Sequence, residues 1–365
     1  MPQFSQALQF VAAQAERILE KYPGHYPMYT VEGLWNREGD RWTSWCEGFF
    51  PGILWLLYKH SGDEKWRRSA EQYTKPLESR RFDRNVHDLG FLFFSTYLRW
   101  YHLTQDPKLR KVLIEAGQTL ALRRQKGGYL CSFIGPHSLF IDIMMNIGIV
   151  FWAARELQDD ALFSIAKDHC RTTARCLVRS DGSTAHEGVF DVSTGAFLRQ
   201  ATHQGWSAGS AWSRGQAWAI YGFTAAYRLS GELEFLGAAQ KCAEYWLQQE
   251  MVDGISSWDF QLPPSQPGLW DSSASAIAAS AFWDLSEVVL SSDIQKYKRA
   301  ALNLLLNLCT DSFLANNKPG WEGVLLHGVY HYHKKLGVDE SVIWGDHFFV
   351  EALVKAVAGR SDAAW

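Results

Sequence analysis

The chain has 365 residues, of which 47% are hydrophobic and 14% aromatic, and its formal net charge is −3 at neutral pH. So small a charge argues against nucleic acid as the main partner, because proteins that bind a polyanion usually present a basic surface. Aromatic side chains are numerous, with 17 Trp, 14 Tyr and 21 Phe. Most are expected in the core, but an aromatic face also packs well against the C–H face of a pyranose, so a sugar ligand is compatible with this composition.

The cysteines are scattered and form no C-x-x-C pair, which favours buried thiols in a reducing compartment over a disulfide framework or a zinc site. The first 21 residues lack the basic start and apolar core of a secretory signal, and no run of 18 apolar residues could span a membrane. We therefore expect a cytoplasmic monomer or homodimer that binds neither nucleic acid nor a membrane. The six cysteines are Cys46, Cys131, Cys170, Cys176, Cys242 and Cys309.

Helical periodicity dominates the chain, and convincing alternating strands are few. The links between the predicted helices are alternately short and long, and the long ones are rich in Gly, Pro, Trp and His. This alternation indicates a degenerate repeat of helical hairpins. The predicted helices span 4–21, 46–60, 63–80, 88–103, 107–125, 140–157, 159–178, 211–229, 233–250, 272–290, 293–311 and 345–358.

Charge divides these helices into two kinds. Residues 63–81 contain ten charged side chains, whereas 88–98 contain only Asp88 and 272–283 contain none. A helix that is apolar on all sides must be surrounded by protein, so the even-numbered helices are expected inside and the odd-numbered ones outside. The sequence thus predicts an all-α fold, an (α/α)6 barrel of six helical hairpins with inner and outer rings, as a single domain over 1–365. Two stacked helical domains are the alternative, although no Pro/Gly/Ser-rich linker divides the chain.

Two acids open otherwise charge-free inner helices, where the long loops end. Asp88 follows His87, and Asp142 lies among Ile, Phe and Met side chains. Asn146 lies one helical turn after Asp142, on the same face, where it could hydrogen-bond the Asp142 carboxyl group. Burial raises the pKa of a carboxyl group, which suits a general acid. The structural alternative is that each aspartate only caps its helix. Two buried carboxyl groups that converge on one pocket would instead form an acid/base pair of the kind that glycosidases use. Asp271 and Asp346 also precede or open inner helices and are expected to face the same cavity.

Arg214 is a polar insertion in another inner helix, where it could bind a carboxylate through two hydrogen bonds or form a buried ion pair with an inner acid. The histidines show no H-E-x-x-H or comparable ligand spacing, and no phosphate-binding glycine motif occurs, so neither a metal nor a nucleotide cofactor is expected.

Seven motifs in this order resemble the unsaturated glucuronyl hydrolases of glycoside hydrolase family 88. The similarity runs from about residue 30 to 358 and implies a hydrolase of the EC 3.2.1 class on an (α/α)6 barrel. The motifs are V-H-D-L-G-F at 86–91, I-D-I-M-M-N at 141–146, T-H-Q-G at 202–205, W-S-R-G-Q-A-W-A-I-Y-G at 212–222, W-D-F at 258–260, D-S-S-A-S-A at 271–276 and I-W-G-D at 343–346.

That family acts on the Δ4,5-unsaturated uronic acid that lyases leave at the non-reducing end of glycosaminoglycan-type oligosaccharides. The resemblance implies that an aspartic acid protonates C4 of the vinyl ether and that water adds at C5. The resulting hemiketal then opens and expels the rest of the sugar. Asp142 matches the acid/base, and Asp88 matches the second essential aspartate, which supports Asp142 and holds the substrate.

The resemblance also assigns substrate contacts. Trp45 and Trp218 match sugar-stacking platforms, with Trp42 a rival for Trp45. Phe133 stands where the family often has Trp, and 206–209 lacks an acid that the family pattern contains, which bears on substrate preference. The polar contacts carried over are His87, His186, His203, Gln204 and Arg214, with Tyr330 and His331 as weaker matches.

Three alternatives stay open at this point. An unsaturated rhamnogalacturonyl hydrolase shares the barrel and the chemistry. A sugar epimerase on the same barrel would need two facing histidines without paired aspartates. A non-catalytic sugar-binding protein would keep the aromatic residues but would not need two acids in charge-free helices.

Overall fold

The computed structural model describes residues 2–35, 44–265 and 268–360. The backbone of these residues folds into two compact units. Unit 1 comprises the described residues within Met1–Lys75, Glu250–Trp258 and Leu262–Asp362, and unit 2 those within Pro76–Gln249 and Asp259–Gln261. The single-domain organisation stays a prediction, and each unit is described in turn.

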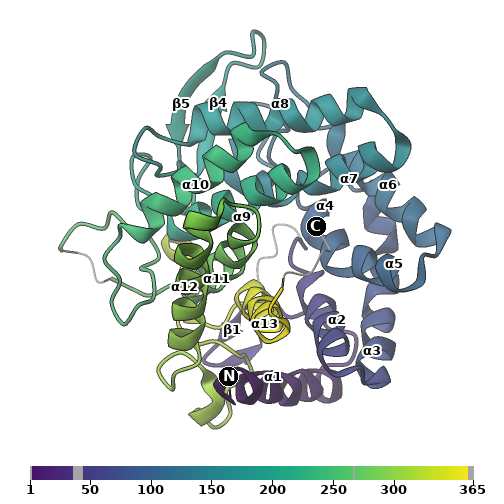
Figure 1. Cartoon of the computed structure of the whole chain (residues 1–365), viewed down its shortest axis with the longest axis vertical. Helices are drawn as coiled ribbons and strands as arrows, with labels where there is room; N and C mark the ends of the chain where they lie inside the picture. Colours follow the sequence, from purple (N-terminus) through teal and green to yellow (C-terminus); the bar gives the residue numbers. More distant parts are fainter. Residues whose placement is uncertain (1, 36–43, 266–267, 361–365) are drawn as a thin grey trace. The chain divides into compact units, whose positions relative to one another are not determined.

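Unit 1 is built on three inner helices, of which α13 packs against both α2 and α11, with α3 on α2, α12 on α11 and α1 on α13 (Figure 1). Every residue of α11 is buried, whereas only five of the 18 residues of α12 are. This contrast confirms the predicted division into apolar inner and charged outer helices. The bounds are α1 Pro2–Lys21, α2 Phe49–Ser61, α3 Glu64–Thr74, α11 Ser272–Ser286, α12 Ser291–Leu308 and α13 Ile343–Ala358.

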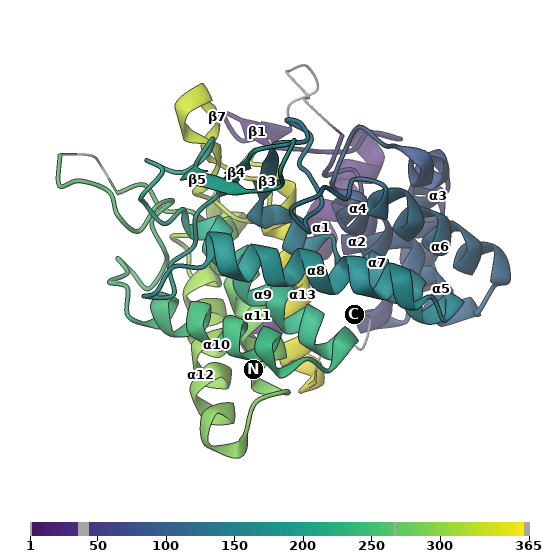
Figure 2. The same ribbon diagram turned by 90° about the horizontal axis from the view of Figure 1, so that it is seen from above.

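Unit 2 repeats this arrangement, with α7 packed against both α4 and α9, and with α6 and α10 outside them; α8 lies against α7 (Figure 2). In α9, 15 of the 18 residues are buried, as expected for an inner helix. The bounds are α4 Leu89–Phe93, α5 Arg99–Thr104, α6 Pro107–Ala121, α7 Gly148–Leu157, α8 Asp160–Leu177, α9 Ser213–Ser230 and α10 Leu233–Leu247.

Short strands occupy the long loops. In unit 2, three antiparallel strands pair in the order β3-β4-β5, with Phe140 opposite Glu187 and Glu187 opposite Ala201. In unit 1, β1 pairs with β2 and β6 with β7. The bounds are β1 Thr30–Val31, β2 Leu34–Trp35, β3 Ser138–Phe140, β4 Glu187–Phe190, β5 Phe197–Ala201, β6 Gly328–His331 and β7 Leu336–Glu340.

The short links end and start helices as their residues predict. Gly62 ends α2 in the left-handed conformation, which a residue without Cβ adopts without strain. Asp63, Asp106 and Asp159 then accept hydrogen bonds from the first-turn amides of α3, α6 and α8, satisfying N–H groups that lack an intrahelical partner. No helix in the described part of the chain is long and apolar enough to cross a membrane.

Two inner helices differ from their predicted form. The helix predicted over 88–103 contains a π-helical segment, Phe94–Leu98, between α4 and α5. The helix predicted over 140–157 begins with a 3-10 segment, Ile141–Met145, and becomes α-helical only at Gly148. A Cβ on Gly148, the first residue of α7, would lie 2.7 Å from a ring carbon of Phe94, so the π-helical segment packs closely against the start of α7. Helix irregularities of this kind are frequent at functional sites.

Candidate active site

Asp88 lies immediately before α4 and is 5% exposed. Its side chain makes no capping hydrogen bond, so the interpretation of Asp88 as a mere helix cap is wrong. Burial, reinforced by the nearby Asp142 carboxyl group, raises the pKa of Asp88 to about 8, because an ionised carboxylate loses its hydration there. This acid therefore keeps its proton at neutral pH.

Asp142 lies in the 3-10 segment before α7, with 14% of its side chain exposed. Burial raises its pKa to about 6, against the opposing effect of the Arg214 guanidinium. Its Oδ2 atom is buried and has no hydrogen-bond partner among the described residues. The two predicted acids thus lie within electrostatic reach of each other in unit 2, and their pKa values are raised to different levels.

Asn146 connects the two segments that carry these acids. Its Oδ1 accepts a hydrogen bond from the Phe91 amide at 2.8 Å, and its Nδ2 donates to the backbone carbonyl of Asp142 at 3.1 Å. The contact predicted from helical spacing was with the Asp142 carboxyl group. The 3-10 backbone presents the carbonyl instead, so Asn146 fixes the main chain and leaves the carboxyl group available.

A neutral histidine faces Asp88. The Nδ1 atom of His87 accepts a hydrogen bond from the Phe133 amide at 3.1 Å, so the ring proton is assigned to Nε2, which lies 3.3 Å from Asp88 Oδ1. Burial lowers the pKa of His87 to about 3. The ring stacks on Phe133 with centroids 5.7 Å apart and planes inclined by 17°, which holds it in this orientation.

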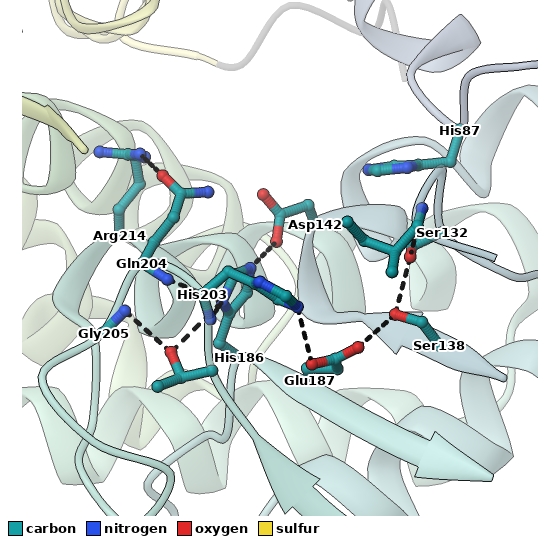
Figure 3. A network of polar contacts seen from close by, with 12 residues as sticks. His87, Ser132, Ser138, Asp142, His186, Glu187, His203, Gln204, Gly205 and Arg214 are labelled. Atoms are coloured by element: carbon teal, nitrogen blue, oxygen red, sulfur yellow. Dashed lines mark hydrogen bonds and ion pairs between the residues drawn. The ribbon is translucent and has the colours of Figure 1, made fainter. Parts of the chain in front are cut away.

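A second histidine faces Asp142 in the same way. His186 Nδ1 lies 3.0 Å from the His203 amide, 3.3 Å from the Gln204 amide and 3.3 Å from the Thr202 hydroxyl. Its Nε2 lies 3.6 Å from Asp142 Oδ2 (Figure 3). Each aspartate is therefore approached by the Nε2 atom of a buried histidine whose Nδ1 is bound by the main chain.

Arg214 and Gln204 lie beside this pair. The Arg214 side chain is 1% exposed, its guanidinium lies 4.4 Å over the Trp212 ring, and it donates to Gln204 Oε1 at 2.6 Å (Figure 3). The stacked, hydrogen-bonded guanidinium is a fixed positive charge next to Asp142 and suits a ligand carboxylate better than a mobile lysine would.

One buried carboxylate was not predicted. Glu187 is 4% exposed and its Oε2 lies 3.0 Å from His203 Nε2. Its Oε1 accepts a hydrogen bond from Ser138 at 2.5 Å, and Ser138 accepts one from Ser132 at 2.7 Å (Figure 3). Although burial alone would raise it, the bonds from His203 and Ser138 hold the pKa of Glu187 below its usual value. The signal in the sequence was the acid adjoining His186, inside an apolar stretch.

The remaining predicted substrate contacts are either covered by other side chains or belong to unit 1. Trp218 is 1% exposed and packs on Phe91 with ring centroids 5.2 Å apart, so its ring offers almost no accessible face in this structure and its stacking role stays a prediction. Trp45, Tyr330 and His331 belong to unit 1, where the Trp45 and Tyr330 rings lie 6.4 Å apart and His331 Nδ1 accepts from the Lys334 amide. The rival Trp42 lies outside the described residues.

Asp271 and Asp346, expected in the same cavity as the two acids, hold loops of unit 1. Asp346 accepts hydrogen bonds from the Val324 and Leu325 amides, and Asp271 from Ser273 and the Val329 amide. Among the described residues, no group of three or more His, Cys, Asp or Glu side chains is arranged to hold a metal ion. Unit 2 brings together seven predicted residues: His87, Asp88, Asp142, His186, His203, Gln204 and Arg214.

The chain is similar over most of its length to known glycoside hydrolases. Residues 14–311 match the model of Glycosyl Hydrolase Family 88. The unsaturated chondroitin disaccharide hydrolase of Streptococcus pyogenes serotype M1 is 34% identical over 324 residues, covering 86% of this chain and 81% of that protein. The crystal structure of the unsaturated glucuronyl hydrolase from Bacillus sp. GL1 is 30% identical, with a TM-score of 0.92 over 99% of both chains. That of an unsaturated glucuronyl hydrolase specific for heparin is also 30% identical, with a TM-score of 0.90 over 98% of both chains.

The match over nearly the whole length confirms the predicted fold class, all-α and of the α/α-barrel type. The family match covers more than half of the chain, and the relatives share its length. This chain therefore belongs to glycosyl hydrolase family 88 and is a glycoside hydrolase.

Proposed function

We propose that this enzyme releases Δ4,5-unsaturated uronic acid from the non-reducing end of lyase-generated, glycosaminoglycan-type oligosaccharides by hydrating the vinyl ether double bond. The observation that carries the proposal is the pair of buried acids, Asp88 and Asp142, whose pKa values are raised to about 8 and about 6 beside the fixed guanidinium of Arg214. An acid whose pKa lies near 6 can protonate carbon and then, as the carboxylate, activate water, while the second acid with its higher pKa stays protonated. The names of the relatives support the substrate class.

In the proposed reaction, protonated Asp142 donates its proton to C4 of the C4=C5 double bond. The positive charge that develops is shared between C5 and the ring oxygen, and water attacks C5 while the Asp142 carboxylate accepts a proton from that water. The acid is thereby restored, and the net change is addition of H2O. The hemiketal at C5 then opens to a ketone, which leaves C1 as a hemiacetal that releases the remaining sugar as an alcohol.

Asp88 takes a different role because its higher pKa keeps it protonated while Asp142 gives and regains a proton. A neutral carboxyl group can donate a hydrogen bond to a sugar hydroxyl and adds no negative charge that would oppose ionisation of Asp142. His87 Nε2, 3.3 Å from Asp88 Oδ1, holds this carboxyl group in place.

Arg214 is proposed to bind the carboxylate of the unsaturated uronate. Its stacked guanidinium presents two N–H groups in a plane, which matches a carboxylate, and this charge also favours the anionic substrate over a neutral sugar. Gln204 and His203 are proposed as further polar contacts, since Gln204 already fixes the Arg214 side chain.

The proposal is tested by replacing Asp142 with Asn, which keeps the shape of the side chain but removes its acid. We expect no loss of the double-bond absorbance when the variant meets unsaturated chondroitin, hyaluronan or heparin disaccharides, with the circular dichroism spectrum and disaccharide binding retained. Turnover near the wild-type rate would remove Asp142 from the mechanism. The fastest substrate of the wild type would identify the glycan, which the names of the relatives leave open between chondroitin and heparin.

A sugar epimerase on the same barrel is disfavoured because its site would have facing histidines without paired aspartates, and here both aspartates lie among the histidines. An unsaturated rhamnogalacturonyl hydrolase remains the nearest rival. Pectin-derived unsaturated disaccharides added to the same assay separate it from the proposal, since that rival would cleave them in preference to glycosaminoglycan fragments.

We also propose a cytoplasmic enzyme that is a monomer or homodimer. The location is supported by the cysteines, because all six are free and five are buried, which suits a reducing compartment. Fractionation of the source cells tests the location, and light scattering during size-exclusion chromatography tests the assembly against the 41.5 kDa mass of one chain.

A further inference from the structure

We propose that the turn Thr202–Gly205 places the proton of His186 on Nε2, and that His186 thereby holds Asp142 Oδ2 and leaves Oδ1 as the oxygen that protonates the substrate. This inference rests on the proposed function, because it takes Asp142 as the proton donor. It makes His186 and Thr202 positioning residues that act through Asp142, in place of the polar contact with substrate that the resemblance assigns to His186.

The tautomer follows from what surrounds Nδ1. The amides of His203 and Gln204 each carry a hydrogen that they can only donate, and both lie within 3.3 Å of this nitrogen. The Thr202 hydroxyl accepts the Gly205 amide at 2.8 Å, so its own proton is free to point at Nδ1, 3.3 Å away. An Nδ1 atom that faces three donors acts as an acceptor, and a neutral ring then carries its proton on Nε2.

The ring cannot easily exchange its two nitrogens. His186 is 3% exposed and lies between Phe140 and Trp212, with ring centroids 4.6 Å and 4.8 Å away. A ring flip would remove the acceptor from all three donors and leave the two amides without this hydrogen-bond partner, which disfavours the flipped ring. The side chain is therefore held in one rotamer and one tautomer by its surroundings.

The two oxygens of Asp142 are consequently unlike. Oδ2 lies 3.6 Å from His186 Nε2, whereas Oδ1 points away from the ring (Figure 3). At 3.6 Å the contact is longer than a hydrogen bond, and such contacts often shorten when substrate binds and charge develops. As Asp142 loses its proton to the substrate, the N–H group supports the new negative charge, which is how preorganised donors assist a proton transfer.

Among the described residues, Arg214 and Asp88 are charged or titratable side chains that also act on Asp142 or are coupled to it. Arg214 comes from α9 and favours the ionised carboxylate, and Asp88 lies at the start of α4 and is coupled to Asp142. The Thr202 hydroxyl, by contrast, contacts the His186 ring and the Gly205 amide. A substitution at Thr202 therefore changes the environment of His186 while the direct electrostatic partners of Asp142 stay in place.

The first test measures the tautomer directly. We would record long-range proton–nitrogen correlations of the enzyme labelled with nitrogen-15 histidine between pH 5 and pH 8, and assign His186 by its absence from His186→Gln. We expect a neutral ring protonated on Nε2 over this range. A ring protonated on Nδ1, or a charged imidazolium at neutral pH, would overturn the inference.

The second test compares Thr202→Val, which removes the hydroxyl at constant shape, with Thr202→Ser, which keeps it. For Thr202→Val we expect kcat to fall about three- to tenfold, as for one lost hydrogen bond, with KM within about twofold of wild type. The weakened His186 N–H group stabilises the Asp142 carboxylate less, so the pKa of Asp142 should rise. The alkaline limb of the kcat profile should therefore move to higher pH. Thr202→Ser should match the wild type within about twofold.

A raised KM with an unmoved alkaline limb would show that this turn serves substrate binding and would overturn the inference, as would a fall in kcat that leaves the limb in place. His186→Gln, whose side-chain amide supplies an N–H group, should keep more activity than His186→Phe. The proposed function fails if Asp142→Asn is active, whereas the inference alone fails if Asp142→Asn is inactive and the His186 proton lies on Nδ1.

Discussion

Gly90 touches the backbone of Asn146, and a Cβ on this glycine would lie 2.5 Å from the α-carbon of Asn146 and 2.9 Å from its carbonyl oxygen. This approach brings α4 against the segment that carries Asp142, and it allows the Phe91 amide to reach Asn146 Oδ1. The spacing of the two acids therefore depends on the absence of a side chain at position 90.

Gly90→Ala should lower both stability and activity. The new methyl group meets backbone atoms that cannot move aside, so we expect the free energy of unfolding to fall by about 1–3 kcal/mol, as in overpacked cores. Gly237→Ala, in the outer helix α10 with open space around the position, is the control and should be neutral or stabilising by about 0.5–1 kcal/mol. Urea unfolding and initial rates measure both effects. Equal behaviour of the two variants would contradict the close packing.

The wild-type rate should fall as the pH rises through about 6. Only the protonated form of Asp142 can donate to C4, and its pKa is raised to about 6. Above that value the protonated fraction decreases about tenfold per pH unit. The profile of kcat/KM against pH measures this limb, and a rate that stays constant from pH 6 to pH 9 would be incompatible with Asp142 as the donor.

Asp88 should make the protein less stable as pH rises. Between the ordinary aspartate pKa of about 4 and the folded value of about 8, the folded state holds a proton that the unfolded state has released. The free energy of unfolding then decreases with rising pH over that window, and the slope ends above about pH 8. Asp88→Asn removes this dependence, so its melting temperature should exceed that of wild type at pH 8 and approach it at pH 4.

Exposed Asp311→Asn is the matched control for the loss of a carboxyl group. A difference between Asp88→Asn and wild type that stays constant from pH 4 to pH 8 would exclude a buried proton on Asp88.

Glu187→Gln should reduce kcat/KM by about tenfold, as expected for the loss of one hydrogen bond to a charged carboxylate. The glutamine amide keeps an oxygen that accepts the hydrogen bond from Ser138, but its NH2 group cannot accept one from His203 Nε2. His203 therefore loses the contact that orients its ring. Glu232→Gln, which breaks the partly exposed Lys167 pair at 3.0 Å, is the control and should leave kcat/KM unchanged. Equal kinetics of the two variants would place His203 outside substrate recognition.

Arg214→Lys should raise KM for the unsaturated disaccharide about tenfold or more, because lysine keeps the charge but loses the planar pair of donors and the stacking on Trp212. Arg214→Met should also move the alkaline limb of the profile to higher pH, since the guanidinium lowers the pKa of Asp142. Arg171→Lys, at an exposed pair with Glu234, is the control. An unchanged KM in Arg214→Lys would rule out Arg214 as the uronate contact.

The inner helices and the two acids were predictable because both leave a local signal. A single aspartate in an otherwise charge-free helix can be identified without any knowledge of tertiary structure. The alternation of short and long links likewise indicates helical hairpins. The environment of each acid was less predictable. Ser138 and Glu187 are 49 residues apart in sequence and meet only because β3 pairs with β4.

The roles of Asn146 and Thr202 could not be read from spacing for a related reason. Asn146 turns towards the Asp142 carbonyl because this segment is 3-10 rather than α-helical, and its other partner, Phe91, is 55 residues away. Thr202 acts on His186 through a turn whose amides carry no residue-specific signal. Backbone donors are common to nearly all residues, so sequence patterns do not reveal them.

The tautomers of His87 and His186, the two histidines beside the acids, are set by main-chain N–H groups. These groups belong to Phe133, His203 and Gln204. Almost any amino acid at these three positions would supply the same hydrogen, and only proline would remove it. The protonation of His87 and His186 is therefore tied to the path of the backbone, and the side chains of these three residues can bind or pack without deciding which ring nitrogen carries the proton.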